Sequence, residues 1–210
     1  QRDLDVGGPQ NDAAGPGGSA RDEPLNAPLF RSLVERLQEG ERAVILDLGP
    51  AQPATISLFS QFRCRLDIAD IAEGLPSIED GDEDPEALRN KVEALLPPRR
   101  DEPTDLVLCW DFLNYFPKPA LKAFMRCVAE RGRPGMLAHA LIAYSAPRIP
   151  AKPNRYAPTE DYRLRVMPTT NQEMDSPRYT PEILGQCMPL YRRERAMLLR
   201  NGMQEFLFLI

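Results

Sequence analysis

The sequence has little of the chemistry that metal sites and disulfide scaffolds need. Its 210 residues include one histidine, His139, and four widely spaced cysteines, Cys64, Cys109, Cys127 and Cys187, with no CxxC pair. Such a set lacks the ligand clusters of a structural zinc site, so we expect no metal. We interpret the cysteines as reduced thiols of a cytoplasmic protein, most of them small core residues.

Long apolar runs and an excess of positive charge are also missing. No run approaches the roughly 20 residues that span a bilayer, and no secretory signal pattern opens the sequence. The net charge is −5 and the pI is about 5.1, which disfavours electrostatic binding to nucleic acid or to an anionic membrane. We therefore expect neither as a partner.

Composition divides the chain into a tail and one domain. Residues 1–24 are Gly, Pro, Asp, Asn and Ser with almost no apolar content, which predicts a disordered N-terminal tail. We expect one folded domain over 25–210. It includes a proline-rich stretch, 145–178, that we interpret as an irregular insert, either a lid or a disordered segment. The acidic run 79–86 lacks the ordered ligands of a calcium-binding EF-hand, so we expect a solvated loop there.

Apolar periodicity alternates helices with buried strands. The patterns predict helices over 26–40, 53–62, 85–96, 118–131 and 181–190. They predict strands over 44–48, 63–69, 104–109, 135–143, 194–201 and 204–210. Asn201-Gly202 between the last two strands is typical of a hairpin turn. If the chain does not bury the final FLFLI, that apolar edge would allow a homodimer.

The most informative stretch is 42–70, which reads as strand, tight turn, helix and second strand. The first strand closes with Asp47-Leu48-Gly49, and the second ends at Asp70. In open α/β sheets, ligands bind at the carboxyl ends of the strands. The stretch is therefore where we expect a binding site.

Four stretches together resemble the class I S-adenosylmethionine-dependent methyltransferase fold over about residues 26–210. They are VILDLGPAQPA, the second strand ending in an acid, TDLVLCWDFLNYFP, and the closing helix and hairpin. The resemblance implies a Rossmann-like α/β three-layer sandwich, with a seven-stranded, mostly parallel sheet and an antiparallel C-terminal hairpin. Asp47 and Gly49 match the acid and first glycine of the family's strand-one motif. Ala51 and Pro53 stand where its second and third glycines belong.

The resemblance also implies a cofactor and a set of residues to bind it. The cofactor is S-adenosylmethionine, and the implied binding residues are Asp47, Gly49, Ala51, Asp70 and Trp110. Glycines in the turn let the backbone approach the methionine part of the cofactor closely. An acid after the second strand can accept hydrogen bonds from both ribose hydroxyls.

Several assignments stay open. Asp67 is an alternative to Asp70 as the ribose acid, and Trp110 is alternatively a packing aromatic. The catalytic residue is unknown; Asp111 and His139 are the candidates for moving a proton. His139 lies inside the apolar run MLAHALIA, where a packed, hydrogen-bonded histidine is the alternative interpretation.

Two functions follow from these residues. Asp47, Gly49 and Asp70 favour an S-adenosylmethionine-dependent methyltransferase that acts on a small molecule or another acceptor, and we lean towards this enzyme. Ala51 and Pro53 favour a catalytically inactive protein of the same fold, kept as a binding or regulatory subunit for a protein partner. A nicotinamide-dependent oxidoreductase is weaker, because the glycine-rich fingerprint is missing.

Overall fold

Six strands form the central sheet of the computed structural model, in the order β2-β1-β3-β4-β10-β9. The structure describes residues 23–38, 42–78, 81 and 84–210. Most of the predicted N-terminal tail and half of the acidic run 79–86 lie outside the described residues. The parallel strands are β1 (Ala43–Asp47), β2 (Cys64–Ile68), β3 (Thr104–Leu108) and β4 (Gly132–Ala143).

An antiparallel hairpin completes the sheet. β10 (Met203–Leu209) pairs with β4 on one side and with β9 (Arg192–Leu198) on the other. Gly202 in the connecting turn has a φ of 79°, a conformation that glycine adopts without a steric penalty. The mostly parallel sheet and its C-terminal hairpin are confirmed.

The predicted count of seven strands is wrong by one for the part of the chain that is described. After β2 the chain forms two 3-10 turns, Ile71–Glu73 and Leu75–Ser77, and then helix α3 (Pro85–Ala94). Pro76 cannot donate to a strand ladder, and the acidic residues that follow have low strand propensity. β2 is therefore the outer strand on this side of the described sheet.

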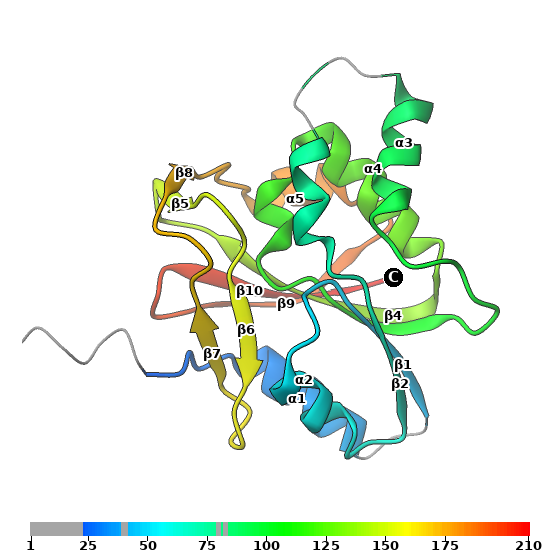
Figure 1. Cartoon of the computed structure of the whole chain (residues 1–210), viewed down its shortest axis with the longest axis vertical. Coiled ribbons are helices and arrows are strands. Elements are labelled where there is room, and N and C mark those ends of the chain that lie inside the picture. Colours follow the sequence, from blue (N-terminus) through cyan, green and yellow to red (C-terminus); the bar gives the residue numbers. More distant parts are fainter. Residues whose placement is uncertain (1–22, 39–41, 79–80, 82–83) are drawn as a thin grey trace, which may run out of the picture.

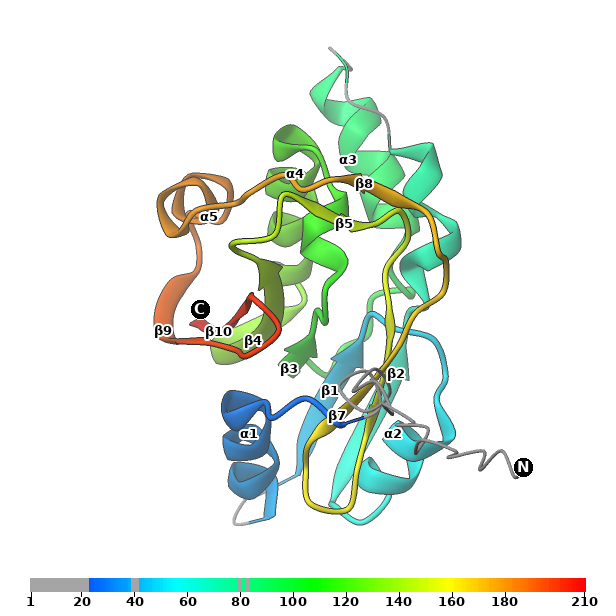
Figure 2. The ribbon, with the colours of Figure 1, turned by 90° about the vertical axis from the view of Figure 1, so that its left-hand side faces the viewer.

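Helices cover both faces of the sheet, which confirms the three layers. Figures 1 and 2 show α1 (Pro28–Gln38) and α2 (Pro53–Phe59) on one face. On the other face lie α3, α4 (Lys118–Ala129) and α5 (Pro181–Cys187). α4 buries Leu121, Phe124 and Val128 against the sheet, as the helical spacing of these residues predicts. None of the described helices has the length and apolar content to cross a membrane.

The two strands of the terminal hairpin differ in burial. Phe206, Leu207 and Phe208 of β10 are buried, so FLFLI is not the exposed edge on which the homodimer expectation rested. β9 is the outer strand, and all seven of its residues are exposed. Arg192, Arg193 and a break in the pairing register beside Phe208 blunt this edge, as natural sheets do to avoid edge-to-edge association.

The proline-rich insert is more regular than its sequence predicts. It holds two short antiparallel ribbons, with residue ranges β5 (Arg148–Pro150), β6 (Arg155–Pro158), β7 (Leu164–Met167) and β8 (Glu173–Asp175). Strands of three or four residues are too short to show a period, and the prolines around them read as breakers. Figure 1 shows the β6–β7 ribbon beside α2.

Candidate functional site

The candidate site lies where the strand order of the sheet reverses. β1 leads into α2 on one face, and its neighbour β3 leads into α4 on the other. The two connections diverge, and ligands of open α/β sheets bind in the crevice that such a divergence leaves. Asp47 and Gly49 stand at the end of β1, and Trp110 and Asp111 follow β3.

Asp47 is a buried carboxylate that fixes both sides of this crevice. Its Oδ1 accepts a hydrogen bond of 2.8 Å from the Gly49 N–H and one of 2.6 Å from the Trp110 indole N–H. Burial raises the pKa of Asp47 to about 6, although the two hydrogen bonds act in the opposite direction. Asp47, at the end of β1, therefore stabilises the turn that follows β1 and holds the indole of Trp110, which follows β3.

Gly49 is required by the close approach of the indole. A Cβ at this position would lie 3.0 Å from Trp110 Nε1 and 3.2 Å from Asp47 Oδ1. Both separations are tighter than normal contacts of a Cβ atom, so a side chain here would displace the tryptophan. The space above the glycine turn is thus filled by Trp110 in this conformation.

Trp110 is the centre of an aromatic cluster that covers the crevice. Its ring stacks on Tyr156 of β6, with 5.5 Å between ring centroids and 7° between planes, and lies 5.7 Å from Phe30 of α1. Its backbone is left-handed, with a φ of 46°, which is rare for a bulky residue and typical of functional or switching segments. Three elements that are distant in sequence therefore meet on the predicted cofactor edge.

Asp70 and Ala51, which follow β2 and β1, are exposed. The Asp70 N–H donates to the Gly49 carbonyl at 3.2 Å, so the end of β2 is joined to the turn after β1. Asp70 also has a left-handed backbone, with a φ of 46°. Its alternative, Asp67, is engaged elsewhere, in a 3.0 Å ion pair with Arg65.

The predicted cofactor-binding residues therefore meet at one edge of the sheet. The residue types at this edge suit a nucleoside cofactor. Asp47 accepts a hydrogen bond from Gly49 in the turn, and the carboxylate of Asp70 beside the turn is exposed. Trp110 lies at the same edge, and its indole packs so closely on Gly49 that a Cβ there would lie 3.0 Å from Nε1. A ligand that approached Gly49 from this side would have to displace the indole.

Asp111 is a second buried acid at this edge. Its Oδ2 accepts hydrogen bonds from the backbone and side-chain N–H groups of Asn154, at 3.0 and 2.9 Å. Its Oδ1 has no hydrogen-bond partner in the described part of the chain. Burial raises the pKa of Asp111 to about 6. A general base works best when its pKa lies near the working pH, and this shift brings Asp111 closer to neutral pH.

The two raised pKa values predict how stability varies with pH. Unfolded aspartates titrate near pH 4, so between about pH 4 and pH 6 the folded chain binds more protons than the unfolded chain. The free energy of unfolding therefore falls as pH rises through this window. We expect urea unfolding to give a value about 1–3 kcal/mol larger at pH 5 than at pH 7. Asp111→Asn should remove about half of that difference; a free energy that rises from pH 5 to pH 7 would contradict the assignment.

His139 is fully buried in β4 and is bound to Glu205 of β10. Its Nε2 lies 2.8 Å from Glu205 Oε1, and the same carboxylate accepts hydrogen bonds from the Leu29 and Phe30 N–H groups at the start of α1. His139 Nδ1 has no partner among the described residues. Sequence reasoning missed Glu205; the signal was an acid next to the apolar run FLFLI in a segment with the pattern of a strand.

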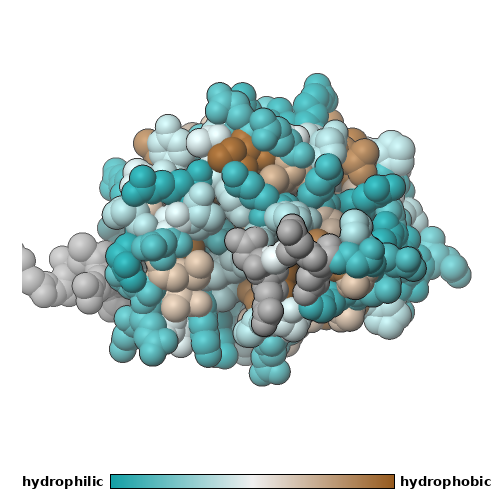
Figure 3. All heavy atoms as spheres, turned by 90° about the horizontal axis from the view of Figure 1, so that it is seen from above, coloured by the Kyte–Doolittle hydropathy of each residue, from teal (hydrophilic) through white to brown (hydrophobic). Residues whose placement is uncertain are grey.

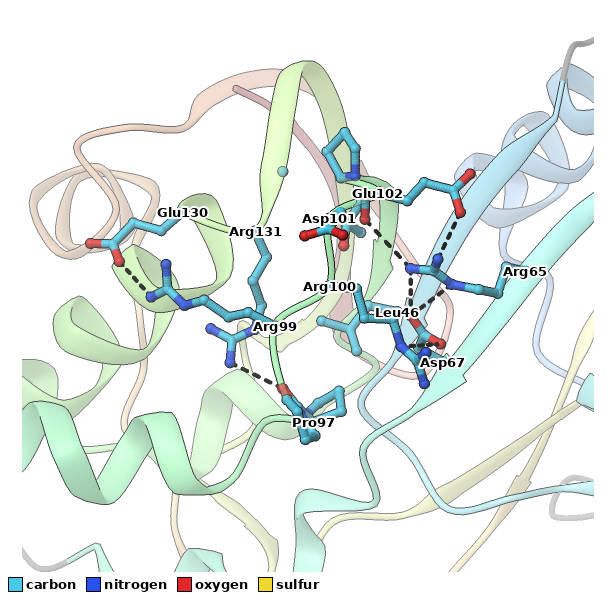
Figure 4. Close-up of a pocket in the computed structure, with 14 residues that line it drawn as sticks. Leu46, Arg65, Asp67, Pro97, Arg99, Arg100, Asp101, Glu102, Glu130 and Arg131 are labelled. Atoms are coloured by element: carbon cyan, nitrogen blue, oxygen red, sulfur yellow. Dashed lines mark hydrogen bonds and ion pairs between the residues drawn. The ribbon is translucent and has the colours of Figure 1, made fainter.

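A separate cavity of about 170 Å³ lies beside the amino ends of β3 and β4, at the opposite edge of the sheet (Figure 4). Arg65 pairs with Glu102 at 2.7 Å, and Arg99 pairs with Glu130 at 2.7 Å. Arg131 donates to the Pro97 carbonyl at 3.1 Å. Since these guanidinium groups already have acidic or carbonyl partners, we interpret this cavity as part of a structural ion-pair network.

All four cysteines are unpaired thiols, and three of them are buried. Burial raises the pKa of Cys127 to about 11, which keeps this thiol protonated at neutral pH. Among the described residues, no three His, Cys, Asp or Glu side chains gather in an arrangement that could hold a metal ion.

Comparison with known proteins identifies the fold. No protein-family model matches the chain, and no curated protein matches it. A methyltransferase structure from Clostridium acetobutylicum, described as S-adenosylmethionine-dependent, is similar with a TM-score of 0.53. It has 10% identity over 86% of this chain and 90% of that protein.

Two further solved structures are similar at TM-scores just under 0.5. The 1,6-didemethyltoxoflavin-N1-methyltransferase of Burkholderia thailandensis has a TM-score of 0.47, with 14% identity over 86% of this chain and 77% of its own. The N-methyltransferase NodS of Bradyrhizobium japonicum has a TM-score of 0.48, with 12% identity over 87% and 86%. With the sheet order described above, the Clostridium structure shows that this chain has the fold of the class I S-adenosylmethionine-dependent methyltransferases.

Proposed function

We propose that this protein binds S-adenosylmethionine at the carboxyl edge of its sheet and transfers the methyl group to a small molecule. The observation that carries the proposal is the junction of the turn after β1 with Asp70. The Asp70 N–H is bonded to the Gly49 carbonyl, and the Asp70 carboxylate is left exposed beside the turn. This is the relation that a ribose-binding acid and a glycine turn need.

The proposal gives Asp70, Gly49 and Asp111 one role each, and the chemistry of each residue supports its role. Asp70 accepts hydrogen bonds from the ribose hydroxyls, and Gly49 allows the backbone to approach the methionine part. The cofactor supplies an electrophilic methyl group when it is bound. The unpartnered oxygen of Asp111 accepts a proton from the methyl acceptor, and its pKa near 6 leaves it mostly ionised at neutral pH. Alignment of donor and acceptor supplies most of the acceleration.

A cavity beside Asn114 has room for a small methyl acceptor. It has a volume of about 540 Å³ and is lined by Asn114, Tyr115 and Tyr179 among others. That volume lies within the range of about 300–1,000 Å³ of small-molecule sites. The Asn114 N–H donates to the Asp111 carbonyl, which ties the cavity wall to the proposed proton acceptor.

The indole over Gly49 weakens cofactor binding in this proposal without abolishing it. A hydrogen bond to a carboxylate contributes about 1.5–3 kcal/mol, and an aromatic stack about 0.5–1.5 kcal/mol. Moving Trp110 off Asp47 and Tyr156 therefore costs about 2–4 kcal/mol, a factor of about 30 to 1,000 in affinity. A site with intrinsic micromolar affinity would then bind at tens of micromolar to about 1 mM.

A second candidate function is a non-catalytic protein of the same fold that binds a protein partner. The closed crevice favours it, as does Pro53 at the start of α2, where no backbone N–H remains to face a ligand. Under this function Trp110 is a residue of the hydrophobic core that does not move.

Calorimetric titration with S-adenosylhomocysteine tests the proposal against this alternative. We expect saturable binding to the wild-type chain in the range of tens of micromolar to about 1 mM. Asp70→Ala should weaken binding at least tenfold, because two ribose hydroxyls lose their acceptor. Asp161→Ala, an exposed aspartate in the β6–β7 connection, is the matched control and should bind like wild type. No heat of binding at millimolar ligand would favour the non-catalytic function.

A further inference from the structure

A groove on the α4–α5 side of the molecule is independent of the proposed function. It lies between α4 and the segment that joins α5 to β9, and its volume is about 310 Å³. Figure 3 views this side of the molecule, where hydrophobic residues form small separate spots on a mostly hydrophilic surface. The groove is therefore a local apolar site rather than part of a broad apolar face.

The floor of the groove is apolar and adaptable. Met125 of α4 and Met188 after α5 are buried there, and Leu190 is 53% exposed at the edge. The Tyr191 hydroxyl donates to the Met125 carbonyl at 2.9 Å, so its polar group is satisfied and its ring forms a wall. Methionines adapt to ligands of irregular shape, and a floor of this kind accepts an aliphatic chain.

The rim of the groove is positively charged. Lys122 and Arg126 lie one turn apart on α4, and no acidic residue lines the groove. Arg126 Nε lies 3.5 Å from Glu130, whereas no ion pair is described for Lys122. Burial raises the pKa of the Cys187 thiol in the floor, while the charges of Lys118 and Lys122 act to lower it. The positive potential of α4 thus reaches the floor of the groove.

We propose that this groove binds a small amphipathic carboxylate, with its aliphatic tail on the methionine floor and its carboxylate at Lys122 and Arg126. On a chain with net charge −5, a groove lined by two cations and no acid selects an anion. The volume, about 310 Å³, is at the lower end of the range for small-molecule sites, about 300–1,000 Å³. A groove of this size, with two cations at its rim, fits a free small anion.

Calorimetric titration of the full chain with decanoate, kept below its micelle concentration, tests the proposal. We expect saturable binding that Lys122→Glu weakens at least tenfold, because repulsion replaces attraction at the carboxylate. Lys152→Glu makes the same charge change at an exposed lysine in the insert, and it should leave the affinity unchanged. Acetate, which lacks the tail, and decanol, which lacks the charge, should each bind at least tenfold more weakly than decanoate.

Three results would overturn the proposal. The first is no binding of millimolar decanoate to the wild-type chain. The second is binding that Lys122→Glu leaves unchanged, which would place decanoate elsewhere. The third is binding of an acidic, hydrophobic peptide where decanoate does not bind, which would make the groove a protein-docking site. Each result is independent of S-adenosylhomocysteine binding, so failure here leaves the proposed function standing.

Discussion

Glu205→Ala is expected to lower the free energy of unfolding by about 3–5 kcal/mol. The carboxylate is fully buried and accepts hydrogen bonds from Leu29 N–H, Phe30 N–H and His139 Nε2. Alanine would leave the first turn of α1 without its acceptor and the imidazole without its partner. Unsatisfied buried groups cost about 1–3 kcal/mol each. At about 2–4 °C per kcal/mol for a chain of this size, the Tm should fall by about 6–20 °C.

The design of this test separates burial from charge. Glu205→Gln keeps the shape and one acceptor oxygen, so its loss should be smaller than that of alanine, and it stays measurable if alanine prevents folding. Glu194→Ala removes an acid of β9, the strand beside β10, that pairs with Arg36 of α1 at the surface, and it should cost less than about 1 kcal/mol. Equal losses for Glu205→Ala and Glu194→Ala in thermal unfolding would contradict the assignment of Glu205 as a structural hub.

Trp110→Phe is expected to tighten binding of S-adenosylhomocysteine by about 10- to 100-fold, although it deletes part of the core. Phenylalanine cannot donate to Asp47, which removes about 1.5–3 kcal/mol from the closed state. Its smaller ring also frees space above Gly49. The folded chain loses stability, but the site no longer has to be opened against the hydrogen bond, so the apparent affinity rises.

A matched variant tests whether the gain belongs to the hydrogen bond. Tyr156→Phe keeps the ring that stacks on Trp110 and deletes only a hydroxyl, so its affinity for S-adenosylhomocysteine should stay within about twofold of wild type. If Trp110→Phe binds no more tightly than wild type, the indole is not the gate. If neither protein binds, Trp110 is core and the chain is the non-catalytic protein.

The sequence predicts the helices and strands of this molecule better than the contacts of its candidate site. The spacing of apolar residues locates the helices and the strands of the sheet, because each buried face requires apolar residues at a regular spacing. The glycine turn is visible because Asp47 and Gly49 are two positions apart. The Trp110–Asp47 hydrogen bond joins residues 63 positions apart, and the Glu205–Phe30 bond joins residues 175 positions apart. No local pattern encodes such partners.

The two errors at the edges of the fold have different origins. The resemblance predicts seven strands where the described sheet has six; Pro76 and acidic residues follow β2, and both disfavour a strand there. The ribbons of the insert are missed because their strands are stabilised by pairing and by contacts such as the bridge between Leu25 and Leu164. Local propensity therefore decides the first case, and tertiary contacts decide the second.

The central claim, that a movable indole covers the cofactor turn, has a direct spectroscopic test. Trp110 is the only tryptophan of the chain, so the indole N–H gives a single NMR resonance that reports on the 2.6 Å hydrogen bond to Asp47. We predict that S-adenosylmethionine shifts this resonance saturably, with the midpoint found by calorimetry, as the hydrogen bond to Asp47 breaks. A resonance that stays unchanged at millimolar S-adenosylmethionine would contradict the claim and leave Trp110 as permanent core.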